Sequence, residues 1–436
     1  MDATLIGIIG IVSFLGLLAL GVPVAVSMLA VGLFGSISIL GFDGGLSLLA
    51  STPYAATATY EYITIPLFLL VGSLALYGGF AQAAYEAAYK WSHKLPGGLA
   101  IATTLACGAF GAVSGSSVAT AATFGRVSIP EMVKYKYDIK FTLGCVASAG
   151  TFAMLIPPSI IIIVYGFFTD TSIARLFMAG IIPGLCTVIA YVLLIIYRVK
   201  RHPEIAPIVA ENTFTMRERL YSSLKAWPIA VIAIIVLGGI YLGWFTATES
   251  AAAAALAALL IAAKQKGIKG ANLPVALRET AYDSAMIFII LVGSILFSRF
   301  LALSQIPNEI ASFIGNLSVS PLLILVGFLA MYFVLGMIIN ALAMLVITLP
   351  LVTPVLMSLG YDLVWFGIVA IKMCEIAVIT PPIGLNVYVV KGVVGEQATL
   401  KDVFSGIWPF VVCDLAVLAL LVAFPQIVLF LPNLMN

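Results

Sequence analysis

The chain has 436 residues, of which 62% are hydrophobic and only 9% are charged. Its mean hydropathy of +1.17 excludes a soluble globular protein, because a chain exposing so few charges would precipitate. The composition predicts an integral membrane protein in a lipid bilayer, and we expect no nucleic-acid partner. The net charge of +2 says little about partners, because membrane proteins spread their few charges over loops. From the N-terminus, the first Lys or Arg is Lys90, so the apolar stretch starting at Thr4 lacks the basic flank of a signal peptide. We expect it to be a retained span.

The remaining apolar stretches predict an all-α polytopic membrane protein. A helix that crosses the hydrocarbon core needs about 20 apolar residues, and about 11–12 transmembrane helices fit the chain. Four further apolar pieces are too short to cross alone, which is typical of re-entrant hairpins and broken helices buried within protein. The candidate spans are 4–20, 22–40, 63–89, 98–113, 139–155, 173–197, 227–244, 247–263, 282–303, 320–339, 363–379 and 404–431, and the short pieces are 114–129, 159–168, 340–358 and 383–394.

The short piece after the fourth span is unusually rich in small residues. In the stretch 108–125, 14 of the 18 residues are Gly, Ala, Ser or Thr. Small residues let helices approach closely, so a packed helix interface is one interpretation. The run Ser114, Gly115, Ser116, Ser117 also favours a non-helical tip with exposed oxygens, which suit a hard cation, beside helix N-termini that suit an anion. Arg126 follows closely and either attracts a carboxylate or lies at the membrane edge.

Two proline pairs interrupt apolar stretches at matching places. Pro157-Pro158 and Pro381-Pro382 are separated by 381 − 157 = 224 residues, and the Tyr-Asp pairs that precede them, at 137 and 361, by the same 361 − 137 = 224. Proline lacks an amide donor and clashes with the preceding turn, so both pairs predict a broken helix. Broken helices at corresponding positions of a repeated membrane chain indicate a transporter's binding site.

Further matches at offsets of 221 to 226 indicate an internal repeat. We expect three parts: a first repeat over 1–197, a basic cytoplasmic linker over 198–226 with a possible surface helix, and a second repeat over 227–436. Opposite orientation of the two repeats is an inference from common transporter architecture. The serine-rich tip is not duplicated, since Asn340 stands where the first copy has Ser114 (340 − 114 = 226).

Polar residues near the second proline pair are further candidates. Thr380 and Asn386 offer side-chain oxygens and Gly384 permits close backbone approach, although Asn386 could instead cap the restarted helix. Glu375 lies inside a span with Lys372 three residues earlier, so an internal ion pair and a transport role are both open.

Other polar residues have structural interpretations. Thr246 and Glu249 fit a capping box, and Asp138 and Asp362, which precede spans, either cap helices or face water. The five cysteines have no metal-ligand spacing and the two histidines lie outside the spans, so we expect no enzyme, no catalytic residue and no organic cofactor.

These residues together resemble a known family. The segments GAVSGSSVATAAT, SAGTFAMLIPPSIIIIVYG, FTATESAA and ITPPIGLN are similar to the large membrane subunit of TRAP (tripartite ATP-independent periplasmic) transporters, in the expected order over nearly the whole chain. The resemblance implies sodium-driven import of an organic acid anion across the bacterial inner membrane by an elevator mechanism. It also implies two partners, a small four-helix membrane subunit and a periplasmic substrate-binding protein. We expect no small subunit fused ahead of the first span.

The resemblance also assigns site residues. It places one hairpin tip at 114–117 opposite an unwound segment at 156–159, and a second tip near Asn340 opposite 380–384. Sodium is expected between each tip and its unwound segment, and the substrate between the hairpins. The implied sodium ligands are Ser114, Ser117, Thr120, Ile156, Pro157, Asn340, Thr380, Pro381 and Gly384; the implied substrate-binding residues are Ser114, Gly115, Ser116, Ser117, Arg126, Asn340 and Asn386.

One alternative is a stand-alone sodium/carboxylate symporter that uses similar broken helices without a binding protein. An intramembrane enzyme lacks a clustered nucleophile and base in this sequence, and repeated broken helices suit alternating access better than a passive channel. The substrate, the sodium stoichiometry and the oligomeric state are not encoded in any motif of the chain.

Overall fold

The computed structural model describes residues 2–207, 214–265, 272–316 and 319–435, and within these ranges the chain is helical with no β-strand. The all-α prediction is therefore confirmed. Seven of the described helices are long and apolar enough to span a membrane, or eight if the bent segment from Met216 to Tyr241 is counted as one span. Five shorter apolar helices accompany them, including the first hairpin helix and parts of the first broken helix. The count of 11–12 spans thus depends on how short and broken helices are treated.

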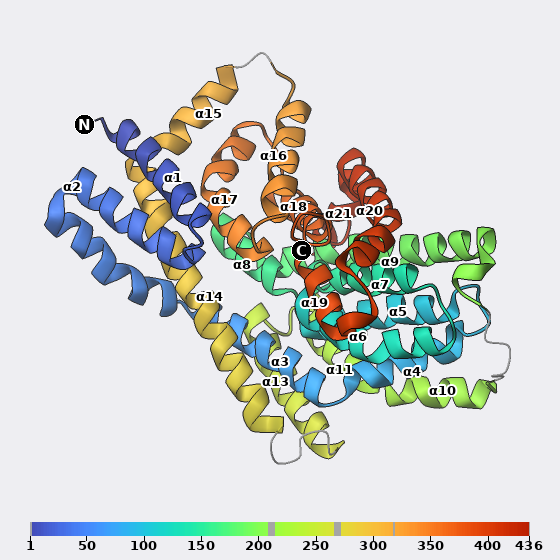
Figure 1. Cartoon of the computed structure of the whole chain (residues 1–436). Helices are drawn as coiled ribbons and strands as arrows, with labels where there is room; N and C mark the ends of the chain where they lie inside the picture. The colour runs from blue at the N-terminus through green and yellow to red at the C-terminus, as the bar shows by residue number, and fades with distance from the viewer. Residues whose placement is uncertain (1, 208–213, 266–271, 317–318, 436) are drawn as a thin grey trace.

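One end of the molecule is built from the N-terminal helices and a long helix from the middle of the chain. Helices α1 (Ala3–Ala19) and α2 (Val24–Thr57) lie beside α14 (Asn272–Leu303), as Figure 1 shows. Helix α2 extends well past the predicted span 22–40, and bends at Gly41, whose φ of +80° is accessible to glycine. A short 3-10 turn, η1 (Tyr60–Ile63), leads from α2 towards the rest of the chain.

The predicted span 63–89 is wrong as a single helix. The chain forms α3 (Thr64–Tyr77) and α4 (Phe80–Ser92), separated by Gly78 and Gly79, of which Gly79 has a φ of +78°. Helix α3 packs between α13 (Ala247–Lys264) and α14. The bent span that precedes α13 consists of α11 (Trp227–Ala233), the π-helical turn η4 (Ile234–Gly238) and α12 (Gly239–Tyr241).

The first half continues as a hairpin, a broken helix and a long span. The hairpin helices are α5 (Gly98–Ser114) and α6 (Ser117–Lys134). The broken helix consists of α7 (Ile139–Ala149), the 3-10 turn η2 (Gly150–Met154) and α8 (Ile160–Thr169). Helix α9 (Ile173–Arg201) and the turn η3 (Pro203–Ile205) follow.

The second half has the same order of elements. After α15 (Ile306–Asn316), the hairpin helices are α16 (Pro321–Gly336) and α17 (Ala341–Ser358). The broken helix consists of α18 (Leu363–Ala377) and α19 (Leu385–Val394), and η5 (Gly395–Gln397) leads to the long α20 (Leu400–Ala423). Helix α21 (Pro425–Leu429) and the turn η6 (Pro432–Leu434) end the described chain. Both proline pairs therefore break their helices, as the sequence predicts.

Around these breaks, helices of each half pack against helices of the other. Helix α6 packs against α7 of its own half and α19 of the other, while α17 packs against α18 and against α8. Helices α7 and α20 cross at Gly144 and Gly406, where a Cβ atom on Gly406 would overlap the carbonyl group of Lys140. The main chains of the two halves are therefore in direct contact at this crossing.

The capping interpretations from the sequence are confirmed. Asp138 accepts a hydrogen bond from the Phe141 amide at the start of α7, and Asp362 accepts from the first amides of α18. At the start of α13, the Glu249 carboxylate accepts from the Thr246 amide while Thr246 Oγ1 accepts from the Glu249 amide. These side chains satisfy amide groups that helix geometry leaves open.

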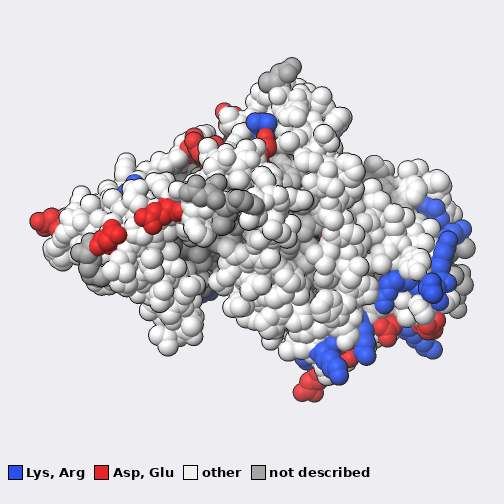
Figure 2. Space-filling view, turned by 90° about the horizontal axis from the view of Figure 1, so that it is seen from above, with Lys and Arg blue, Asp and Glu red and all other residues white. Residues whose placement is uncertain are grey.

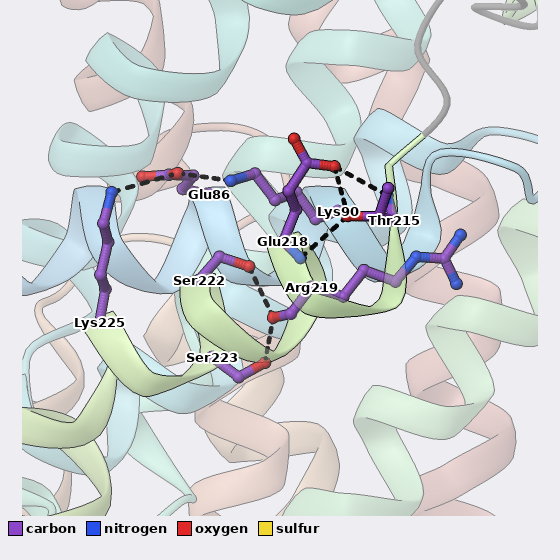
Figure 3. Close-up of polar contacts among 8 residues, drawn as sticks. All are labelled: Glu86, Lys90, Thr215, Glu218, Arg219, Ser222, Ser223 and Lys225. Carbon is purple, nitrogen blue, oxygen red and sulfur yellow. Dashed lines mark hydrogen bonds and ion pairs between the residues drawn. The ribbon is translucent and has the colours of Figure 1, made fainter.

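The basic linker contributes a surface helix. Residues 208–213 of the linker lie outside the described ranges, and α10 (Met216–Lys225) begins with a capping box of Thr215 and Glu218. Helix α10 packs on α4, where Glu86 is within ion-pair distance of both Lys90 (2.8 Å) and Lys225 (3.6 Å), as Figure 3 shows. Hydrogen bonding to Lys90 and the charge of both lysines lower the pKa of Glu86.

Positive side chains concentrate at this end of the molecule. In Figure 2 most of the visible Lys and Arg side chains gather at one end, the end at which Figure 1 places α10. Cytoplasmic segments of membrane proteins carry an excess of Lys and Arg. The distribution supports the prediction that α10 faces the cytoplasm.

Candidate transport site

The serine-rich tip of the first hairpin is a buried, non-helical turn. Helix α5 ends at Ser114, Gly115 adopts a φ of +61°, and α6 begins at Ser117. Ser116 is extended, and its Oγ accepts a hydrogen bond from the Ala119 amide. Glycine is favoured at position 115 because other residues adopt this conformation less readily. The predicted non-helical tip is confirmed.

This tip lies directly against the first proline break. A Cβ atom on Gly115 would come within 2.9 Å of the Pro158 carbonyl oxygen, so the tip and the unwound segment are in contact. On its other side α3 approaches equally closely, since a Cβ on Gly72 would lie 2.7 Å from the Ser114 carbonyl oxygen. The structure therefore brings 114–117 and 156–159 together, as the resemblance implies.

Several carbonyl oxygens at this junction accept no hydrogen bond from the described residues. Within the described ranges, no hydrogen bond reaches the carbonyl oxygens of Ile156, Pro157 and Pro158. The helix restarts only at Ile160, and its first amides do not bond back to these three carbonyls, so the break leaves them without helical donors. Nearby, Thr120 donates to the Ser116 carbonyl (2.8 Å) and shares a hydrogen bond of 2.9 Å with Ser114 Oγ. Buried carbonyls rarely stay unpaired, so this arrangement is suited to a cation or ordered water.

Asn386 connects the first hairpin to the second break. Its Oδ1 accepts from Ser117 Oγ at 2.9 Å, and its Nδ2 donates to the Ala147 carbonyl at 3.3 Å. The alternative that Asn386 caps α19 is wrong, because the N-cap residue is Gly384 and the Asn386 side chain is bound to the other half. The side chain is fully buried, so both bonds are shielded from solvent.

The second tip is more open than the first. Asn340 is exposed and caps α17 by accepting from the Leu342 amide at 2.9 Å. The tip approaches α18 at Gly336, where a Cβ atom would lie 2.5 Å from Ala377. Thr380 is buried and donates to the Ile376 carbonyl, and Gly384 has a φ of +61° at the restart of the helix. The second tip thus contacts the helix leading into the break, whereas the Asn340 side chain binds its own main chain.

Arg126 lies away from the first tip. It is exposed on α6, nine residues after Ser117, which corresponds to about 14 Å along the helix axis. Its role in substrate binding remains a prediction from the sequence.

A second arginine that was not among the predicted site residues, Arg299, lies within the predicted span 282–303. It is half-buried on α14 and donates to Thr52 Oγ1 at 3.0 Å, and none of the ion pairs among the described residues includes it. It borders a cavity of about 160 Å³ between α14, η1 and α8, lined by Tyr62, Phe167, Phe168, Ile295, Ser298 and Arg299. The available signal was simple: a charge inside a span is a functional candidate by default.

The predicted pair of Lys372 and Glu375 exists and has a third member. Lys372 Nζ lies 2.8 Å from Glu375 Oε2 and 2.7 Å from Asp414 Oδ1. Asp414 lies on α20 inside the predicted span 404–431, and it too carried the signal of a charge within a span.

Paired hairpins and broken helices buried in an apolar helical bundle define the class of secondary membrane transporters. The family model described as "Tripartite ATP-independent periplasmic transporter, DctM component" matches residues 11–427. The chain belongs to this family, and it is a multi-pass protein of the bacterial inner membrane with a transport rather than an enzymatic role. Large permeases of this family transport organic acids, and they work together with a periplasmic binding protein and a small subunit.

Curated relatives cover nearly the whole chain. The C4-dicarboxylate TRAP transporter large permease protein of Pseudomonas aeruginosa is 36% identical over 93% of this chain and 94% of its own length. The ectoine TRAP transporter large permease protein of Halomonas elongata is 30% identical over 97% of this chain and 98% of its own length. The names of these two relatives state different substrates.

The solved structure of the YdaH transporter of Alcanivorax borkumensis has a similar fold. Its TM-score is 0.62, with 16% sequence identity, over 88% of this chain and 89% of that one. At this identity the likeness concerns the fold alone.

Proposed function

We propose that this chain is the transport subunit of a sodium-coupled secondary transporter that imports an organic acid anion delivered by a periplasmic binding protein. The observation that carries the proposal is the contact of Gly115 with Pro158, which places a serine-rich tip beside carbonyl oxygens without donors. Such breaks mark ion and substrate sites in transporters built from repeats.

The chemistry of the first junction suits sodium. Its free groups are uncharged carbonyl and hydroxyl oxygens, the ligand type that hard cations prefer. Candidate ligands are the carbonyls of Ile156 and Pro157 with the hydroxyls of Ser114 and Thr120. Ser117 contributes indirectly, because its hydroxyl donates to Asn386 and fixes α6 against α19. The equivalent ligands of the second junction would come from Asn340, Thr380, Pro381 and Gly384.

The substrate anion would bind between the hairpins and meet a positive charge on the way. Arg299 is better placed than Arg126 for this role, because it lies on an apolar helix long enough to span a membrane and borders a partly open cavity. An unpaired arginine inside a membrane protein attracts anions strongly, since little water screens it.

An elevator mechanism would move both hairpins and both broken helices as a unit. Their exchanged contacts support this, because α6 packs on α19 and α17 packs on α8. Helices α1, α2 and α14 would form the fixed part, together with the small four-helix subunit.

The test is uptake of labelled organic acids into proteoliposomes that contain the chain, a small subunit and a binding protein. We expect uptake only with an inward sodium gradient. Uptake that is independent of sodium would overturn the coupling, and uptake by this chain alone would favour the stand-alone symporter.

Two serine variants sharpen the assay. Ser117→Leu would fill the space at the buried tip and abolish sodium-dependent uptake, while expression is retained. Ser405→Leu is the matched control, because Ser405 is an exposed helical serine that bonds only its own helix. Equal sodium activation in both variants would remove the tip from the site.

A further inference from the structure

A cluster of polar side chains is enclosed where α9 and α20 meet α18, the helix that leads into the second break. Its members are Lys372 and Glu375 of α18, Asp414 of α20 and Tyr191 of α9, and each has an exposed fraction of 0%. No step of the proposed sodium coupling uses these groups.

The hydrogen bonds distinguish the two carboxyl groups. Asp414 is fully bound, because Lys372 donates to its Oδ1 at 2.7 Å and Tyr191 donates to its Oδ2 at 2.7 Å. Glu375 accepts a hydrogen bond only from Lys372 among the described residues, at 2.8 Å on Oε2. Its Oε1 atom is buried and has no partner among the described residues. An ionised carboxylate would leave that oxygen unsolvated, whereas a carboxylic acid carries a proton there.

The charge of the cluster leads to the same conclusion. Two carboxylates and one ammonium group sum to −1, and burying an uncompensated charge costs several kcal/mol. Buried groups in this situation take up a proton instead.

The surroundings supply no second positive charge. The charged residues of these helices outside the cluster lie towards the helix ends: Arg175, Arg198, Lys200 and Arg201 on α9, at least seven residues from Tyr191, and Lys401 and Asp402 on α20, at least twelve residues from Asp414. The remaining titratable groups on the packed helices are Cys374 of α18, Cys413 of α20, Cys186 and Tyr197 of α9 and Tyr332 of α16, with Tyr165 of α8 farther along α18. All are neutral in their ordinary state. A water molecule could donate to Glu375 Oε1 but would not change the charge.

We propose that this cluster is a proton-binding site, with one proton held on Oε1 of Glu375. Binding forms an O–H bond from an oxygen lone pair and a solvent proton, and it brings the cluster from a charge of −1 to zero. A sodium ion is a poor substitute, because the ammonium group of Lys372 already lies against both carboxyl groups.

The position of the cluster gives the proton a route to influence transport. Glu375 precedes Thr380 by five residues on the helix that leads into the second break, about 7.5 Å along the axis. Gain or loss of the proton would change the charge close to that break. The proposal rests on the cluster geometry and not on sodium coupling, so the two can fail separately.

The test is infrared spectroscopy of the purified full-length protein in detergent. We expect the carbonyl stretch of a protonated carboxylic acid at neutral pH, its disappearance on alkalinisation, and its absence in Glu375→Gln. Asp414→Asn should also remove the band, because Glu375 then becomes the sole counterion of Lys372. Tyr191→Phe should leave the band in place, since Tyr191 bonds Asp414 and not Glu375.

Three results would overturn the proposal. A band that persists in Glu375→Gln would place the proton elsewhere, and a shift in Tyr191→Phe would place it on Asp414. Loss of the band when sodium is added at constant pH would mean that the site takes a metal cation. If Glu375→Gln fails to fold, the pH and sodium titrations of the unaltered protein still decide the question.

Discussion

The two helices that lead into the proline breaks place different chemistry at the same positions. Ser148 and Thr151 of the first half stand 224 residues before Lys372 and Glu375 of the second (372 − 148 = 224 and 375 − 151 = 224), which is also the offset between the two proline pairs. In the first half, Thr151 Oγ1 donates to the Ser148 carbonyl at 2.8 Å, within its own helix segment. In the second half, the charges depend on Asp414, which is 42 residues away in the chain.

The comparison shows that equivalent positions can be polar for different reasons. The Thr151 hydroxyl is satisfied locally and the uncharged Ser148 hydroxyl has no partner among the described residues, so neither depends on a distant side chain. Buried charges require a specific distant partner and leave a large penalty when that partner is lost. The second half should therefore be the more sensitive of the two to substitution.

The largest expected effect comes from removing the positive charge of the buried cluster in the second half. Lys372→Met leaves two carboxyl groups without their cation, and breaking a buried pair costs about 3–5 kcal/mol. We expect little folded protein, measured by yield and by the thermal unfolding midpoint in detergent. The triple variant Lys372→Met, Glu375→Gln, Asp414→Asn should recover much of the loss because no charge remains.

The matched change in the first half is Ser148→Ala. The Ser148 hydroxyl is buried and donates to none of the described groups, so its removal should leave the unfolding midpoint unchanged or raise it. Equal losses in Lys372→Met and Ser148→Ala would contradict the comparison.

The next effect concerns the contact between the first tip and the first break. Gly115→Ala adds a Cβ at a φ of +61° and 2.9 Å from the Pro158 carbonyl oxygen. The control is Gly243→Ala, where φ is +70° and no atom lies within 4 Å of the added carbon. Both variants bear a backbone strain of about 1–2 kcal/mol. Only Gly115→Ala should also lose uptake, and equal uptake in the two would separate the tip from the transport site.

A smaller effect measures the link between the halves. Ser117→Ala, Asn386→Ala and the double variant form a cycle around the hydrogen bond of 2.9 Å that joins α6 to α19. We expect a coupling free energy of about 0.5–1.5 kcal/mol from thermal unfolding. Strict additivity would show that this bond contributes nothing.

The smallest effect lies at the surface, between α4 and α10. The pKa of Glu86 is lowered by Lys90 and Lys225, so its stabilising contribution is present above the unfolded-state pKa and is lost as the pH falls through the folded-state value. Glu86→Gln should cost about 0.2–1 kcal/mol at neutral pH. The difference from the unaltered protein should vanish in acid and shrink in high salt. A difference that is constant with pH would rule out the ion pair as its source.

Local chemistry made part of this structure predictable. The breaks at both proline pairs, the caps at Asp138 and Asp362, and the capping box at Glu249 depend on neighbouring residues alone. The extent of α2 and the division of the span 63–89 were missed, because a membrane-length apolar run does not show where glycines turn the chain. Gly41 and Gly79 make those bends through conformations that composition cannot reveal.

The sequence predicted which residues belong to the candidate site better than it predicted which of them contact one another. The pairing of Gly115 with Pro158 was expected from the family resemblance. The partners of Asn386 were not, because Ser117 lies 269 residues away and only the folded chain brings them together. Asp414 and Arg299 were visible as charges within spans, but their partners, Lys372 and Thr52, are set by tertiary packing.

The crossing of α7 and α20 at Gly144 and Gly406 limits how the two halves can move. Helices separated by side chains can slide when those side chains change rotamer, but two main chains in contact have no such freedom. The contact between Gly144 and Gly406 therefore leaves little room for α7 and α20 to shift relative to each other. A displacement of the helix entering the first break would therefore push directly on α20 of the other half.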